Sequence, residues 1–316
     1  MSEILQANSA SNEYDTAIIG AGPAGISAAI WCSELGLNSI LIEKNRFVGG
    51  MLLNVFNPIA NYPGLTLENG EKLARLLENN LKQSNCGLEL NCEVTEVDWK
   101  NRAIITGSDK SIKCRVLIFA AGTRRKTLNV KGEKELLGKG ILMSAKRDGK
   151  KASDAVAAVI GGGDAALENA LILSEFADKV FLIRRRTDFS ARKDFVDKVT
   201  QSRKIVILEN TQVLEFCGKD RLEYIKLKSD KKGIYDLEVN YAVVRIGFQP
   251  NSELLKELVE TDSKGYIITN NLWQTSVGEI LAIGDVACPV SPTIATAVGA
   301  GATAAKYAYS LLKKLS

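Results

Sequence analysis

The chain has 316 residues, of which 46% are hydrophobic and 25% charged, and 41 Lys and Arg against 37 Asp and Glu give a net charge of +4. This composition is that of a globular protein of about two domains, and it excludes intrinsic disorder, collagen and a disulfide scaffold. The net charge is too small for this length to indicate nucleic acid or an anionic membrane as a partner.

The sequence contains no histidine, which removes imidazole metal ligands and the usual general base at neutral pH. Catalysis must therefore use a carboxylate, Lys, Tyr, a thiol or a cofactor. The cysteines form no Cys-x-x-Cys pair, so their spacing predicts neither a metal site nor a redox dithiol. We expect scattered reduced thiols at Cys32, Cys86, Cys92, Cys114, Cys217 and Cys288.

The N-terminal residues 1–13 are expected to be a polar tail, because they lack the apolar core of a signal peptide. Two charge-free stretches, 16–33 and 286–305, are interrupted by Gly and Pro, so we expect neither to span a membrane. The sequence therefore predicts a cytoplasmic protein with no membrane partner.

Residues 14–43 contain a first nucleotide-binding pattern. A short apolar strand (14–19) precedes the turn GAGPAG (20–25), an apolar helix and a second strand that ends at Glu43, which lies 43 − 20 = 23 positions after the first glycine. Glycines in such a turn let the backbone approach a diphosphate at the helix N-terminus, and the acid accepts hydrogen bonds from ribose hydroxyls. The pattern predicts a dinucleotide with an unphosphorylated ribose.

The same pattern recurs in residues 154–186. A strand (154–160) leads into GGGDAA (161–166), a helix and a strand that reaches Arg184, at the same offset of 184 − 161 = 23. Arg184, Arg185 and Arg186 replace the acid of the first unit. Guanidinium groups bind a ribose 2′-phosphate that a carboxylate would repel, so this unit is predicted to bind NADPH. A solvated basic strand end is the alternative interpretation.

Short segments with period-two alternation follow each unit and predict small antiparallel layers attached to it; they are 88–100, 102–107, 114–122, 205–210, 211–218, 222–229 and 241–247. A last strand (278–285) ends at Asp285, before an apolar helix (293–315). Asp285 and the helix N-terminus could offer a carboxylate and free backbone donors to one ligand. Hinges are expected at 120–124 and 247–251.

The order of the two units, together with several shorter motifs, resembles the low-molecular-weight thioredoxin reductases over about residues 14–312; the motifs are VGG (48–50), NYPG (61–64), AAGT (120–123), VFLIRRR (180–186), RIGFQPN (245–251) and AIGDV (282–286). This resemblance implies an α/β fold with two Rossmann-like dinucleotide-binding domains. An NADPH domain (120–247) would be inserted into a split FAD domain (1–119 and 248–316). It also implies hydride transfer from NADPH to FAD, and a homodimer.

The resemblance and the two glycine patterns together assign residues to both cofactors. The FAD residues would be Gly20, Ala21, Gly22, Pro23, Gly25, Glu43, Lys44, Gly50, Met51, Asn61, Val94, Gly122, Gly284, Asp285, Thr293 and Ile294. The NADPH residues would be Gly161, Gly163, Asp164, Ala165, Ala166, Arg184, Arg185, Arg186, Arg245, Ile246 and Gly247. No metal site is expected.

The chain departs from the family where the redox motif Cys-x-x-Cys-Asp-Gly would stand, because residues 144–149 read SAKRDG. Ser144 and Arg147 occupy the two cysteine positions, and neither side chain can cycle between thiol and disulfide. Asp148 remains as a candidate for a catalytic acid, with a turn-forming Asp-Gly as the alternative. With Lys146, these residues suggest a polar, cationic pocket that favours an anionic or aromatic acceptor.

Two further differences, Met51 and the segment 291–293, lie where the family contacts the flavin. An altered acceptor site and neutral drift both account for them.

The sequence thus predicts an FAD-dependent NAD(P)H oxidoreductase that cannot use the usual dithiol relay. Its acceptor could be a small molecule, a quinone, oxygen, a second flavin, or an electron carrier such as ferredoxin or flavodoxin, since the flavin carries the chemistry. One alternative is a flavin-binding pseudoenzyme that acts as a sensor or scaffold. Another is a disulfide reductase that uses Cys288 or the pair Cys86 and Cys92.

Overall fold

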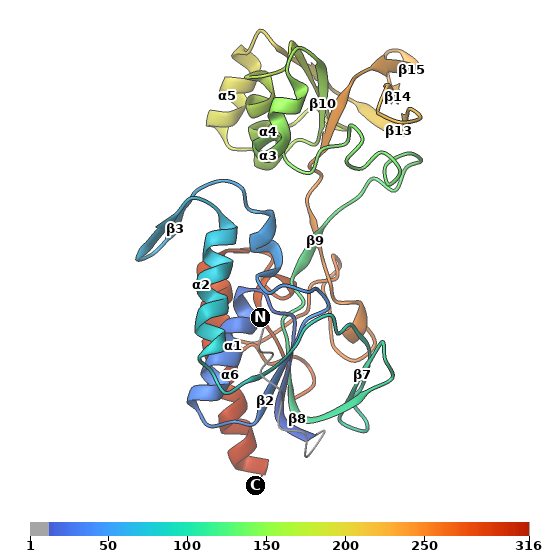
Figure 1. Cartoon of the computed structure of the whole chain (residues 1–316). Coiled ribbons are helices and arrows are strands. Elements are labelled where there is room, and N and C mark those ends of the chain that lie inside the picture. The colour runs from blue at the N-terminus through green and yellow to red at the C-terminus, as the bar shows by residue number, and fades with distance from the viewer. Residues whose placement is uncertain (1–12, 316) are drawn as a thin grey trace. The chain divides into compact units, whose positions relative to one another are not determined.

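The computed structural model describes residues 13–315, which divide into two compact units (Figure 1). Unit 1 consists of residues up to Arg124 and from Gln249 onward, and unit 2 is Arg125–Phe248. The chain passes from one unit to the other at two short paired strands, β9 (Thr123–Arg125) and β17 (Phe248–Pro250). The first division lies at the end of the predicted hinge, because Asn251 donates hydrogen bonds to the carbonyls of Gly122 and Ala121 and holds this segment in unit 1.

Unit 1 is built on a seven-stranded sheet with the order β5-β2-β1-β8-β7-β6 and with β18 beside β8. Strands β5, β2, β1, β8 and β18 are parallel, and β6 and β7 are antiparallel. Ile18 in the central strand lies opposite Leu41 on one side and Ile118 on the other. The strands are β1 (Glu13–Ile19), β2 (Ser39–Ile42), β5 (Gly87–Glu89), β6 (Val94–Asp98), β7 (Ala103–Thr106), β8 (Ser111–Phe119) and β18 (Ile280–Ala282).

Three helices pack together in unit 1, namely α1 (Pro23–Glu34), α2 (Gly70–Lys82) and α6 (Ile294–Leu315) (Figure 1). Small residues let α1 and α6 approach closely, since a Cβ atom at Gly301 would lie 2.4 Å from the carbonyl oxygen of Ala24. Alanines of both helices share one core with strands β1, β2 and β8. The remaining elements of unit 1 are the hairpin β3 (Ile59–Tyr62) and β4 (Leu65–Leu67), and the short helices η1 (Gly50–Asn54), η3 (Glu253–Leu255) and η4 (Gly284–Val286).

Unit 2 has a four-stranded parallel sheet with the order β12-β11-β10-β16. Two separate hydrophobic cores lie against this sheet. The helices pack into one core and the antiparallel sheet β13-β14-β15 into the other, so the helices cover one face and the antiparallel sheet covers the opposite face. The strands are β10 (Val156–Ile160), β11 (Lys179–Ile183), β12 (Ile205–Leu208), β13 (Thr211–Cys217), β14 (Tyr224–Ser229), β15 (Gly233–Glu238) and β16 (Tyr241–Val244). The helices are α3 (Ala145–Asp148), η2 (Gly149–Ala152), α4 (Asp164–Ser174) and α5 (Lys193–Gln201).

The prediction of small antiparallel layers holds for β13 and β14 and for the pair β6 and β7, and it is wrong for three other segments; β15, which completes the sheet with β13 and β14, is not among the predicted segments. Strands β8, β12 and β16 are parallel members of the main sheets. The four residues from Val116 to Phe119 are all completely buried, because strands inside a parallel sheet are covered on both faces. The segment 88–100 is also not one strand, since Asn91, with φ of 53°, turns the chain between β5 and β6.

Within residues 13–315, none of the helices combines the length and apolar character that a membrane span needs.

Candidate functional site

The glycine turn of unit 1 is held in a conformation that larger residues would not adopt. Gly20 has φ of +101°, and a Cβ atom there would lie 2.5 Å from the carbonyl oxygen of Ala120. A Cβ atom at Gly25 would lie 1.9 Å from the carbonyl oxygen of Gly20. Helix α1 begins directly after Gly22, whose position receives no side-chain cap. The first N–H groups of α1 are therefore available to a bound anion.

Glu43 is fixed at the end of β2, and it is 6% exposed. Its Oε2 accepts a hydrogen bond from the backbone N–H of Ala21 (2.8 Å), and its Oε1 accepts two from Asn45 (2.9 and 2.6 Å). A carboxylate oxygen accepts about two hydrogen bonds, so Oε2 retains one acceptor position. That position suits a ribose hydroxyl and fits the adenosine part of FAD.

A cleft of about 1000 Å³ runs through unit 1 beside this turn. The predicted FAD residues that line it are Gly20, Gly22, Pro23, Glu43, Lys44, Gly50, Met51, Val94, Gly122, Gly284, Asp285, Thr293 and Ile294. Three predicted residues do not line it. Ala21 is completely buried behind the turn, Gly25 packs against Gly20, and Asn61 is exposed on the β3–β4 hairpin. The size and donor set of the cleft suit a dinucleotide.

Asp285 lies in η4 at the wall of this cleft. Burial raises the pKa of this carboxyl, and a hydrogen bond with Thr123 partly opposes that effect. A hydrogen bond from a hydroxyl donor stabilises a buried carboxylate. Asp285 therefore fits the hydroxyl-bearing ribityl chain of FAD.

The cleft also contains a charged pair that the sequence analysis missed. Arg124 donates from Nη1 to Oδ1 of Asn251 (2.6 Å) and from Nη2 to Oε1 of Glu253 (2.5 Å), and all three residues line the cleft. The hydrogen bond from Arg124 lowers the pKa of Glu253, although burial opposes this. No local pattern signals this contact, because residues 124 and 253 are far apart in the chain and only the fold joins them.

The glycine turn of unit 2 repeats the geometry of the first turn. Gly161 has φ of +145°, and a Cβ atom there would lie 2.1 Å from the carbonyl oxygen of Arg245. Helix α4 begins at Asp164, and Gly163 before it provides no side-chain cap. Asp164 accepts hydrogen bonds from the N–H (2.7 Å) and Nε (2.8 Å) of Arg192. The N–H of Ala166 donates to the carbonyl oxygen of Gly163 (2.9 Å), so the earlier N–H groups of the helix, including that of Ala165, are the ones that lie at its open N-terminus and suit a diphosphate.

The structure separates the three predicted arginines after β11. The Arg184 side chain is 4% exposed, forms an ion pair with Glu209 and lies 3.5 Å from the centroid of the Phe189 ring. Arg185 and Arg186 are both exposed to solvent. Ile246 is half-buried and Gly247 is exposed, on the segment that follows β16. Only two of the three arginines are therefore free to meet a phosphate in solution.

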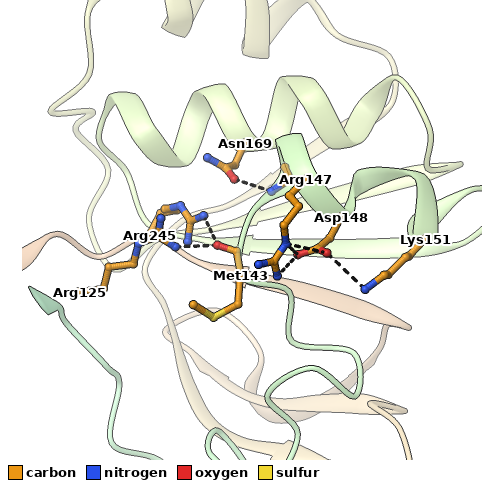
Figure 2. A network of polar contacts seen from close by, with 8 residues as sticks. Arg125, Met143, Arg147, Asp148, Lys151, Asn169 and Arg245 are labelled. Atoms are coloured by element: carbon orange, nitrogen blue, oxygen red, sulfur yellow. Dashed lines mark hydrogen bonds and ion pairs between the residues drawn. The ribbon is translucent and has the colours of Figure 1, made fainter. Parts of the chain in front are cut away.

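The segment 144–149 forms a short helical turn in unit 2, and its polar contacts are drawn in Figure 2. Arg147 binds the carboxylate of Asp148 through Nε (3.1 Å to each oxygen) and Nη2 (2.7 Å), and Lys151 lies 3.3 Å from the same carboxylate. Burial alone would raise the pKa of Asp148, but the hydrogen bonds from Arg147 and Lys151 outweigh it and the pKa is lowered. Ser144 is buried, and Lys146 is exposed.

Comparisons with known proteins cover nearly the whole chain. Residues 14–304 match the pyridine nucleotide-disulphide oxidoreductase family. The thioredoxin reductase of Peptoclostridium litorale is 32% identical over 96% of this chain and 98% of its own. The solved thioredoxin reductase of Lactococcus lactis is 30% identical over 95% of this chain and 99% of its own, with a TM-score of 0.83.

A second solved structure, the T. acidophilum thioredoxin reductase, is 28% identical over 97% of this chain and 100% of its own, with a TM-score of 0.80. Together these matches confirm the predicted α/β fold with two Rossmann-like dinucleotide-binding domains.

Proposed function

Because this chain belongs to the pyridine nucleotide-disulphide oxidoreductase family, it is an FAD-dependent NAD(P)H oxidoreductase, and we propose that its electrons leave FAD for an acceptor other than a dithiol at residues 144–147. FAD supplies the hydride-accepting chemistry when it is bound. The chain's own residues bind and orient the two cofactors. In unit 1, Glu43, Asp285 and the N-terminus of α1 are the groups that would hold FAD.

The NADPH site is proposed at the glycine turn of unit 2 and on the exposed arginines Arg185 and Arg186. In this proposal Arg184 does not contact the coenzyme. Its Nη2 donates to Glu209 and to the carbonyl of Thr187, and the side chain is buried against Phe189, so we assign it to fixing the end of β11 and not to binding phosphate.

The pairing of Arg147 with Asp148 is the observation that carries the acceptor proposal. An arginine stands where a redox thiol would be needed, and it holds the neighbouring carboxylate in the charged form. A carboxylate that is bonded to two cations is a poor proton donor. This segment can therefore supply neither the electron pair of a dithiol nor the proton that such a relay would use.

Four of the cysteines give little support to a disulfide reductase. All six are free, and burial raises the pKa of Cys86 to about 11, that of Cys32 to about 12 and that of Cys114 to about 12. A thiol reacts as its thiolate, so these groups are poorly reactive near neutral pH. Burial also raises the pKa of Cys92.

The proposal is tested by following NADPH oxidation by the FAD-loaded protein with benzoquinone and, separately, with oxidised thioredoxin. We expect turnover with benzoquinone and none with thioredoxin. Reduction of thioredoxin at a rate similar to that of benzoquinone would contradict the proposal. The matched control is the double variant Ser144→Cys with Arg147→Cys, which restores both thiols while leaving the cofactor residues unchanged.

We propose that two copies of this chain form a homodimer, as expected from its family. Light scattering of the FAD-loaded protein should give about twice the mass of one chain, and the mass of a single chain would contradict it.

A further inference from the structure

Two arginines in unit 2 share one acceptor, in an arrangement that the cofactor sites do not explain. Arg125 donates from Nη1 to the carbonyl oxygen of Met143 (2.6 Å), and Arg245 donates from Nη2 to the same oxygen (2.7 Å). Figure 2 shows both guanidinium groups converging on this carbonyl from segments that are remote in sequence. The two positive charges therefore face each other at close range.

These two arginines carry more guanidinium N–H donors than there are protein acceptors bonded to them. A guanidinium group carries five N–H donors. Within residues 13–315, Arg125 makes the single hydrogen bond to Met143, and Arg245 makes one other, to the carbonyl of Val244 (2.8 Å). Neither forms an ion pair with a carboxylate of the described residues, whereas Arg147, Arg184 and Arg192 each do.

The charges around the pair leave it electrostatically strained. Burial and, to a smaller extent, the charge of Arg125 lower the pKa of Arg245 to about 10, and Glu168 partly opposes them. Burial and the charge of Arg147 lower the pKa of Arg125. Half-buried guanidinium groups that repel each other bind an oxyanion well, because it neutralises both charges and accepts hydrogen bonds from each planar fork.

We propose that Arg125 and Arg245 form an oxyanion site in unit 2, and that its ligand is the carboxylate or phosphate group of a small molecule other than the pyridine nucleotide. The inference goes beyond the proposed function, because it assigns a binding site that neither cofactor requires. The diphosphate of the coenzyme has its own donors at the N-terminus of α4. Arg245 faces that turn with its backbone carbonyl, and its side chain is directed to Met143.

Equilibrium dialysis of radiolabelled inorganic phosphate against the FAD-loaded protein tests this site, with NADP⁺ at saturation so that the coenzyme site is filled. We expect one phosphate per chain. The double variant Arg125→Gln with Arg245→Gln should weaken this binding by about tenfold or more, as expected for loss of charge-assisted hydrogen bonds. The control Arg203→Gln, an exposed arginine of the same unit, should leave it unchanged.

The single variant Arg125→Gln provides a second test that does not depend on the double variant's folding, because Arg245 still holds the Met143 carbonyl. It should also weaken phosphate binding. Three results would overturn the proposal: no stoichiometric phosphate binding by the unmodified protein, binding that both variants retain, or binding that disappears when NADP⁺ is present. The last would assign the two arginines to the coenzyme.

Discussion

The exposed and buried arginines after β11 should respond differently to substitution. In the double variant Arg185→Gln with Arg186→Gln, the solvent-exposed guanidinium groups are lost and the fold keeps its contacts. In Arg184→Ala, a buried side chain that pairs with Glu209 and stacks on Phe189 is lost. We expect the first change to alter coenzyme preference and the second to alter stability.

The magnitudes follow from these environments. Each exposed arginine that loses one charge-assisted hydrogen bond to the 2′-phosphate should weaken binding by about 1–2 kcal/mol, so the pair should raise the KM for NADPH roughly 30- to 1000-fold. NADH lacks that phosphate, and its KM should change by less than about twofold. Truncation of the buried Arg184 should lower the free energy of unfolding by about 1–3 kcal/mol, mainly through lost packing.

Steady-state kinetics with benzoquinone as the acceptor and urea unfolding measure the two effects. Equal changes in KM for NADPH and NADH would show that Arg185 and Arg186 are only a basic surface. An Arg184→Ala protein of full stability, with the NADPH defect of the double variant, would refute the assignment of Arg184 to a structural role.

Three other changes test separate contacts. Glu43→Gln places an amide N–H₂ group among the N–H donors that now bind Glu43. The free energy of FAD binding, measured by flavin fluorescence, should therefore weaken by about 1–3 kcal/mol. An unchanged affinity would contradict the ribose contact. Asp148→Asn should lower the free energy of unfolding by about 1 kcal/mol at pH 7. Because the folded pKa of Asp148 is depressed, that difference should begin to shrink as the pH falls below about 4 and should vanish only below the folded pKa. Urea titrations in which it grows at low pH would contradict the pairing. Cys86 has its pKa raised to about 11, so it should react with iodoacetamide at pH 8 roughly 100-fold more slowly than a free cysteine. The variant Cys86→Ala should leave NADPH oxidation unchanged. Rapid labelling of Cys86 in peptide mass spectra would support a cysteine mechanism instead.

The local geometry of the two glycine turns could be predicted from the sequence. Gly20 and Glu43 belong to one strand–turn–helix–strand segment whose spacing determines its geometry, and the structure places both at the cleft. The prediction for β8 is wrong because alternation along a segment does not reveal which strands pair with it or in which direction.

Contacts between distant segments could not be predicted. The pairs Arg124–Glu253 and Arg125–Arg245 come together only through the fold. The burial of Arg184 depends on Phe189 and Glu209, which lie beyond the motif that drew attention to it.

An anaerobic titration of the FAD-loaded protein with NADPH, followed by the visible absorbance of the flavin, tests the central claim most directly. NADPH delivers one electron pair, and if residues 144–147 supply no redox dithiol, as we propose, one FAD takes up that pair. We therefore expect complete bleaching at one NADPH per FAD. A requirement for two NADPH per FAD would reveal a second two-electron centre, and a flavin that stays oxidised with NADPH but bleaches with dithionite would contradict NADPH as the donor.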